Sequence, residues 1–357
     1  MQRTYIAPTF QALLAAVLFG ASAPLAKVLL GQVEPVFLAS FLYLGSGFGV
    51  LLFRIAAALR SPGQAQEARL SRSDFRWLTG AVAAGGVLAP ILLLFSLRET
   101  PASTASLLLN FEGVATAFIA AVVFKEAMSR RALWAILAVT LGSILLSWDA
   151  SGDWGISLGA LGVVGACALW GIDNNLTRNI AAKDPLTIVL VKGLGAGTVS
   201  FILALLLGNR LPALPVILGA MILGSLSYGL SIALFIRAMR GLGAARTSAV
   251  FGTAPLAGVA LSFAMFQETV TLSFAGALLL MMAAMAMLLT EQHGHRHRHE
   301  AITHDHRHRH DDDHHNHDHP GMTDRSLSHA HAHAHETLEH EHPHLPDIHH
   351  RHAHASE

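Results

Sequence analysis

Glu112 is the first residue of this sequence whose chemistry needs an explanation. It lies about twelve residues into an apolar run at 101–123. A charged side chain near the centre of a bilayer costs at least about 2.5–3.5 kcal/mol, so it needs a partner or a function. We expect Glu112, with Asn110 two residues earlier, to contribute to a substrate site, where its carboxylate would bind a cationic substrate or carry a coupling proton. In the alternative interpretation, Glu112 is a structural carboxylate that is paired with a base such as Lys192 or is protonated.

A second group of polar residues follows an aromatic residue at the end of another apolar run, 155–173. Trp170 and Asn174 share a helical face with Cys167, and Asp173 is adjacent to that face. We interpret Trp170, Asp173 and Asn174 as a patch at the mouth of a cavity that hydrogen-bonds a substrate or coordinates a cation. The alternative is a helix end that enters water, where Asn and Asp are favoured because they bond to nearby backbone groups.

The C-terminal residues 291–357 carry a third candidate site. All 23 histidines lie between His293 and His354, and many alternate with other residues. Alternate side chains of an extended segment share a side, and neutral imidazole binds Ni, Co, Cu and Zn well. This composition is typical of metal binding, although it would also suit a solvated chain with no ligand. The residues that we expect to bind a divalent metal (Ni, Co or Zn) are His293, His295, His297, His299, His304, His306, His308, His310, His329, His331, His333 and His335.

The residues up to 290 and the tail that follows have opposite chemistry. The first part has 18 basic and 11 acidic residues, a net charge of +7, and the tail has 6 basic and 13 acidic residues, a net charge of −7. A membrane-spanning helix needs about 20 mostly apolar residues, and backbone polar groups in lipid must be satisfied within the segment. We therefore predict ten transmembrane helices. Their ranges are 9–30, 35–59, 75–97, 101–123, 132–148, 155–173, 186–207, 214–236, 243–266 and 271–290.

The basic residues between these runs predict the orientation in the membrane. With a cytoplasmic N-terminus and ten spans, the inner connectors hold 14 basic residues and the outer connectors hold only Lys27, Arg98 and Arg210. Basic residues are enriched in cytoplasmic loops. We expect a multi-pass protein of the inner (plasma) membrane with both termini in the cytoplasm, provided that the number of spans is even.

Residues that recur at a nearly fixed distance indicate an internal duplication. Arg98 and Arg240 each end a predicted span, and they are 142 residues apart. Other related segments are Phe124-Lys125-Glu126 with Phe266-Gln267-Glu268, at the same offset, and Leu18-Phe19-Gly20 with Leu169-Trp170-Gly171, at an offset of 151.

The duplication predicts an all-α membrane protein of two five-helix repeats, 9–148 and 155–290, followed by a disordered cytoplasmic tail at 291–357. Because five is an odd number, the second repeat must be inverted relative to the first. Inverted repeats are the plan of many secondary transporters, whose substrate site lies near the midplane between the repeats.

The two five-span halves, the aromatic-Gly pair in the first span of each half and the Phe-x-Glu triplet after the fourth span resemble the EamA-type transporters of the drug/metabolite transporter superfamily. The resemblance covers about residues 9–290. The histidine-rich C-terminus is similar to that of members linked to nickel and cobalt resistance. The family implies carriers without ATP hydrolysis, many of them exporters of amino acids or other small metabolites. One departure is that Glu112 stands where the second half has Ala254.

We therefore expect a secondary active transporter that exports a divalent transition-metal cation, Ni²⁺ or Co²⁺, with the tail capturing or sensing the metal. Two alternatives stay open: an exporter of amino acids or other small metabolites with a metal-buffering tail, and a membrane-bound metal sensor that transports nothing. We expect no enzyme, because no nucleophile–base pair or phosphate-binding loop is present. The expected partners are the lipid bilayer and a small-molecule or metal-ion substrate, with no nucleic acid, no required cofactor, and a homodimer left open.

Overall fold

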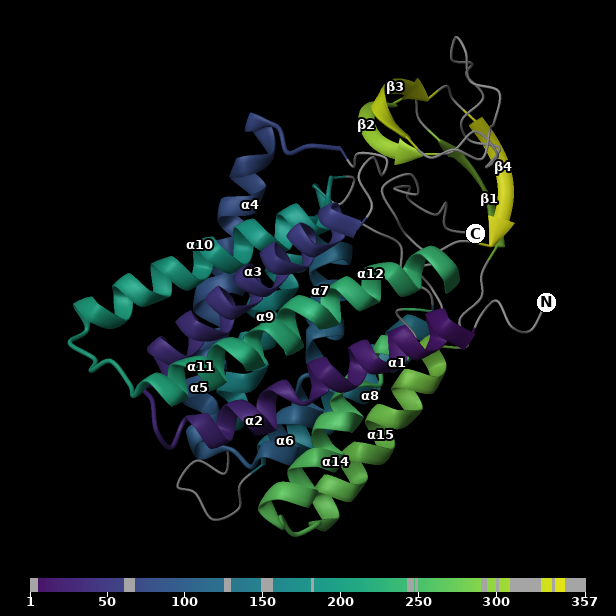
Figure 1. The fold of residues 1–357 in the computed structure, drawn as a ribbon. Coiled ribbons are helices and arrows are strands. Elements are labelled where there is room, and N and C mark those ends of the chain that lie inside the picture. The colour runs from purple at the N-terminus through teal and green to yellow at the C-terminus, as the bar shows by residue number, and fades with distance from the viewer. Residues whose placement is uncertain are drawn as a thin grey trace.

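The protein is a bundle of helices followed by a tail that contains strands (Figure 1). The outward-facing side chains of the bundle include many large apolar ones, such as Leu59, which is 81% exposed, and Leu206, which is 79% exposed. An apolar surface of this kind is stable in contact with lipid. The computed structural model describes residues 6–60, 68–124, 130–148, 157–180, 183–242, 247, 250–289, 294–299, 302–308, 329–335 and 338–343.

Helices form both halves of the bundle, the first half being residues 6–148 and the second half residues 157–289. The first half contains α1 (Ile6–Gly20), α2 (Ser22–Leu29), α3 (Pro35–Arg60), the 3-10 turn η2 (Arg72–Asp74), α4 (Phe75–Ala81), the π-helix η3 (Val82–Leu88), α5 (Ala89–Glu99), α6 (Ala102–Leu108), α7 (Phe111–Phe124) and α8 (Arg130–Ser147). The second half contains α9 (Leu158–Arg178), α10 (Pro185–Leu206), α11 (Leu214–Gly224), the π-helix η4 (Ser225–Leu230), α12 (Ser231–Leu242), α14 (Ala254–Phe266) and α15 (Leu272–Leu289).

Six helical stretches of the described chain are long and apolar enough to cross a membrane. They are Ile6–Leu29, Pro35–Leu59, Arg72–Glu99, Ala102–Val123, Pro185–Leu206 and Leu214–Ala238. Three shorter apolar helices, Leu133–Ser147, Ala254–Phe266 and Leu272–Met287, lie within three other predicted spans. The sixth predicted span coincides with α9, whose last turns carry polar residues. The six long spans are confirmed as apolar helices, and the total of ten stays a prediction.

The two halves pack by exchanging equivalent contacts. Helix α1 of the first half packs against α12 and α14 of the second half. In the same way, α9 of the second half packs against α5 and α7 of the first half. Helices α3 and α10 pack against each other, as do α6 and α14, and α8 and α15. This pattern is what two copies of one unit produce when each contributes the same surfaces to their interface.

Gly20 and Gly171, the glycines of the two aromatic-Gly pairs, let the helix backbones approach closely at these exchanged contacts. A Cβ atom on Gly20 would lie 2.0 Å from the carbonyl oxygen of Ala254 in α14. A Cβ atom on Gly171 would lie 2.9 Å from backbone and side-chain carbons of Ala115 in α7. Small residues at membrane helix interfaces let backbones approach. The recurring motif therefore serves the same contact in both halves.

The Glu of the second Phe-x-Glu triplet also joins the halves. The Glu268 carboxylate accepts hydrogen bonds from the backbone N–H groups of Ala102 (2.8 Å) and Ser103 (3.0 Å), at the start of α6. The Lys27 ammonium donates to the carbonyl of Thr100 just before that helix. A carboxylate at a helix N-terminus satisfies backbone donors that have no partner within the helix. Glu126, the equivalent of Glu268 in the first half, lies outside the described residues.

The tail contains four described strands, where the sequence predicted a disordered chain. They are β1 (Gly294–His299), β2 (Ile302–His308), β3 (His329–His335) and β4 (Leu338–Pro343). β1 pairs antiparallel with β4, and β2 pairs antiparallel with β3. The alternation of His with other residues has a period of two, which is the period of a strand. For these four segments, strands therefore replace the predicted disorder. Of the predicted metal ligands, His293 and His310 lie outside the described residues.

Candidate functional site

A break in the fourth predicted span places Glu112 at the start of a helix in mid-membrane. α6 ends at Leu108, a turn follows, and α7 begins at Phe111. Glu112 therefore lies in the first turn of α7 and close to the middle of the stretch Ala102–Val123. The backbone N–H groups of Leu109, Asn110 and Glu112 donate to carbonyls of the preceding residues, so α6 and α7 form one interrupted stretch. Interrupted helices form substrate sites in many carriers.

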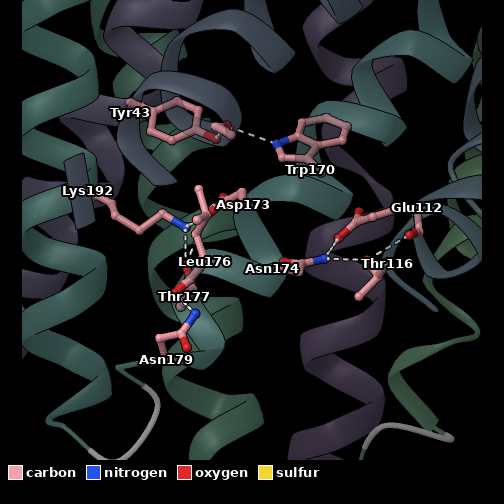
Figure 2. A network of polar contacts seen from close by, with 11 residues as sticks. Tyr43, Glu112, Thr116, Trp170, Asp173, Asn174, Leu176, Thr177, Asn179 and Lys192 are labelled. Carbon is pink, nitrogen blue, oxygen red and sulfur yellow. Dashed lines mark hydrogen bonds and ion pairs between the residues drawn. The ribbon is translucent and has the colours of Figure 1, made fainter. Parts of the chain in front are cut away.

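Glu112 contacts the second half of the protein through Asn174 of α9. The Asn174 side-chain amide donates to Glu112 Oε1 over 2.9 Å and approaches Thr116 Oγ1 at 3.1 Å (Figure 2). Thr116 lies one turn beyond Glu112 and donates to its backbone carbonyl. The Glu112 side chain is half-buried, and Asn174 is exposed. None of these three side chains is therefore fully enclosed by the packed helices.

Aromatic side chains lie beside this polar group. The Trp170 indole Nε1–H donates to the carbonyl oxygen of Gly85 over 3.0 Å, and the Tyr43 hydroxyl donates to the same oxygen over 2.7 Å (Figure 2). Gly85 belongs to the π-helix η3, and π-helical turns commonly occur at functional sites. Tyr43 stacks on Tyr228 of η4 with ring centroids 5.9 Å apart.

The row of rings continues away from Tyr228 through residues of the first and second halves. Phe19 packs edge-on against Tyr228 at a centroid distance of 5.8 Å, and Phe251 lies 5.3 Å from Phe19. Phe235 follows at 4.9 Å from Phe251. The sequence analysis missed these aromatic residues. The two tyrosines could have been noticed, because a hydroxyl inside an apolar span needs a hydrogen-bond partner.

Asp173 belongs to a different cluster from Glu112, although it is adjacent to Asn174. The Lys192 ammonium of α10 lies 2.6 Å from Asp173 Oδ1 and 2.7 Å from Oδ2, and Thr177 donates to Oδ1 over 2.9 Å (Figure 2). Lys192 is therefore the ion-pair partner of Asp173 rather than of Glu112. Figure 2 shows the two clusters on opposite sides of one stretch of α9.

Asn110 does not join either cluster. Its side-chain amide donates to the carbonyl of Leu107 over 3.0 Å and lies 3.9 Å from the sulfur of Met281 in α15. The side chain thus closes the turn between α6 and α7 against the last helix. Asn110 and Glu112 therefore contact different residues, because side chains two positions apart in a helical turn face different neighbours. Their contacts do not favour a common role in binding one substrate.

A metal site would need a different set of side chains from those that surround Glu112. Among the described residues, no group of three or more His, Cys, Asp and Glu side chains is arranged to hold a metal ion. Cys167 is fully buried, and its sulfur lies 3.6 Å from the Leu108 carbonyl. The site therefore offers the Glu112 carboxylate, which accepts from Asn174, together with a hydroxyl group and the Trp170 ring, a set that suits a small cation with apolar surface.

Comparison with known proteins identifies the family. The model of the EamA-like transporter family matches residues 8–148 and again residues 157–290. An uncharacterized transporter of Methanothermobacter thermautotrophicus is 29% identical over 272 residues, which cover 71% of this chain and 78% of that protein. A crystal structure of another protein shares the fold, with a TM-score of 0.57 at 18% identity, over 78% of this chain and 94% of the other. The chain therefore belongs to the EamA-like transporter family of the drug/metabolite transporter superfamily and is a multi-pass membrane transporter.

Proposed function

We propose that the protein is a secondary transporter that exports a small organic cation, such as an amine-bearing metabolite, and that Glu112 binds the positive charge. One observation carries this proposal. Glu112 of the first half and Asn174 of the second half meet at 2.9 Å, so the candidate ligand of the substrate lies at the interface between the two family matches. Substrate sites of transporters built from repeats lie at such interfaces.

The side chains around Glu112 favour an organic cation over a bare metal ion. The Trp170 indole lies on the Glu112 side of this network, and the Tyr43 ring lies on the Lys192 side and is joined to Trp170 through the carbonyl oxygen of Gly85 (Figure 2). Aromatic faces attract cations by about 0.5–2 kcal/mol and also bury apolar surface. A transition metal would instead favour several imidazole or thiolate ligands.

Transport would proceed by rocking of one half against the other around this site, as in other carriers with repeated halves. The exchanged contacts mean that α1 would move with α12 and α14 of the second half, and α9 with α5 and α7 of the first half. Export, the inner membrane, cytoplasmic termini and the inverted relation of the halves are parts of this proposal. The charge of the connectors and the two family matches support them.

Transport assays with the purified full chain in liposomes test this function. The first probe is radiolabelled phenyltrimethylammonium, a permanently charged aromatic cation, competed by primary amines, amino acids, Ni²⁺ and Co²⁺. We expect saturable exchange that amines inhibit and that Glu112→Gln reduces at least about tenfold, as expected when an ionic contact of about 1.4 kcal/mol is lost. Failure to exchange or bind any organic cation in this panel would refute the proposal.

Export of Ni²⁺ or Co²⁺ is a second candidate, and the register of the tail strands favours it. Histidine stands opposite histidine at five paired positions, among them His297 opposite His340 and His306 opposite His331. The pairing thus brings histidines from separate parts of the tail to facing positions of the strands. This candidate predicts that the protein protects cells from Ni²⁺ or Co²⁺ and that deletion after Thr290 weakens the protection. An unchanged cellular metal content would exclude it.

A further inference from the structure

A buried ion pair lies one residue away from the proposed substrate contact, and the mechanism above does not use it. Asp173 is 5% exposed and holds the Lys192 ammonium at 2.6 and 2.7 Å. A buried ion pair rarely stabilises a protein more than apolar residues of the same size would. Ionisable residues inside membrane spans commonly belong to ion or proton pathways. The pair therefore calls for a functional explanation.

The surroundings of Asp173 fix its position closely. Its carboxylate lies against Gly85 of η3, where an added Cβ would come within 1.9 Å of Asp173 Oδ2. Thr177, one turn further along α9, donates to Oδ1 over 2.9 Å. The titratable groups that face Asp173 from other helices are Lys192 on α10, Glu112 on α7 and Tyr43 on α3.

The charges of these groups link the ion pair to the substrate site. Glu112 interacts electrostatically with both Asp173 and Lys192. With both carboxylates ionised and Lys192 protonated, the cluster carries one net negative charge, which a bound cation at Glu112 neutralises. A proton on Asp173 would neutralise the cluster equally well. It would also leave the Lys192 charge uncompensated, and that charge would repel a cation at Glu112.

We infer that Asp173 is the coupling-proton site of this transporter and that Lys192 transmits its protonation to Glu112. This inference rests on the proposed function. In each cycle one cation leaves Glu112 on the outer side, one proton binds an Asp173 carboxylate oxygen there, and the same proton leaves on the inner side before the next cation binds. No covalent bond is made or broken. Because linkage is reciprocal, cation binding at Glu112 also expels the proton.

The arrangement along α9 suits such coupling. Asp173 and Asn174 are consecutive residues, and one turn of the helix holds the proton site on the α10 side and the substrate contact on the α7 side (Figure 2). Lys192 lies seven residues after the start of α10 at Pro185, roughly 10 Å along the helix at about 1.5 Å per residue. The pair is thus within the membrane but near the end of α10 that we predict to be cytoplasmic.

The experiment compares pH-driven uptake with exchange in liposomes that contain the full chain, with phenyltrimethylammonium as the probe because it cannot itself carry a proton. In the wild type, one pH unit across the membrane should drive about tenfold accumulation, the limit for one proton against one cation. Asp173→Asn, which mimics the protonated carboxylate, should lose this accumulation and keep exchange. Its affinity for the probe should fall about tenfold and lose the part of its pH dependence that Asp173 contributes, within the range of known coupling effects.

A second variant separates coupling from damage to the fold. Asp173→Asn with Lys192→Gln removes both charges, so affinity should return to within about threefold of the wild type while pH-driven accumulation stays absent. Glu34→Gln, which removes a carboxylate from the exposed pair with Arg98, should behave as the wild type in every assay. Accumulation by the double variant, or unchanged pH dependence in Asp173→Asn, would overturn the inference and leave the proposed function intact. Wild-type probe binding by Glu112→Gln would overturn the proposed function itself.

Discussion

The side-chain amide of Asn174 donates a 2.9 Å hydrogen bond to the carboxylate of Glu112, and this contact joins the two halves of the transporter. Glu112 comes from a helix that starts in mid-membrane, and Asn174 comes from a helix that packs into the other half. A substrate cation that binds Glu112 would compete for an oxygen that Asn174 holds in its absence.

Replacement of Asn174 by Ala should weaken substrate binding. Without the amide, the Glu112 carboxylate loses a hydrogen bond that supports its charge and its orientation, an effect worth about 1 kcal/mol or about fivefold in affinity. Equilibrium binding of phenyltrimethylammonium to the purified chain measures this. Asn179→Ala is the matched control, because Asn179 caps the end of α9 through backbone carbonyls and lies away from Glu112. Equal affinities of Asn174→Ala and the wild type would contradict the assignment.

Gly85 should tolerate no side chain. A Cβ atom there would lie 1.9 Å from Asp173 Oδ2, so Gly85→Ala must push the carboxylate away from Lys192 or shift η3. We expect a loss of about 1–3 kcal/mol in the free energy of unfolding, typical of overpacking. Gly113→Ala is the control, because no atom lies within 4 Å of its added Cβ. Reversible unfolding in mixed micelles, followed by circular dichroism, compares the two variants, and equal stabilities would refute the prediction.

Tyr43 and Trp170 should be energetically coupled through the carbonyl oxygen that they share. Tyr43→Phe or Trp170→Phe leaves Gly85 with one donor, whereas the double variant leaves a buried carbonyl without either of them. Side-chain hydrogen bonds in membrane proteins average about 0.6 kcal/mol. We expect small single effects and a double effect that exceeds their sum by about 0.5–1 kcal/mol in the unfolding free energy. Strict additivity would show that the two contacts do not support each other.

The predicted topology places Arg130 and Arg246 on the same, cytoplasmic face. Cys167 is buried, and in a Cys167→Ala background single cysteines at positions 130 and 246 should react with a membrane-impermeant maleimide only after the cytoplasmic face is opened. A cysteine at position 210 should react from the outside of intact cells. Labelling of positions 130 and 246 from opposite faces would refute the ten-span arrangement and with it the inverted repeats.

The sequence was sufficient to predict the six long apolar helices, but not the contacts that the recurring motifs make. Uninterrupted apolar runs leave the backbone no alternative to a helix in lipid, and the aromatic-Gly pairs at Gly20 and Gly171 indicated the duplication before their close contacts were known. The strands of the tail were not predicted, because composition alone suggested an unstructured chain. Their His-x alternation was present in the sequence and has the period of a strand.

The division of the site into two clusters could not be predicted from the sequence. Asp173 and Asn174 are neighbours, and helical geometry places them about 100° apart, but only packing decides which neighbours each one meets. Lys192 was a plausible ion-pair partner for Glu112 or Asp173, and in the structure the position of α10 places it against Asp173. The aromatic row from Tyr43 to Phe235 joins residues almost 200 positions apart, so no local pattern indicated it.

The most direct test of this account is the affinity of the purified full chain for phenyltrimethylammonium, measured by equilibrium binding for the wild type, Glu112→Gln and Glu34→Gln. The account predicts that Glu112→Gln binds at least about tenfold more weakly, while Glu34→Gln, which lacks a carboxylate in the exposed pair with Arg98, binds as the wild type does. Equal affinities for all three proteins would contradict the claim that the Glu112 carboxylate holds the transported cation.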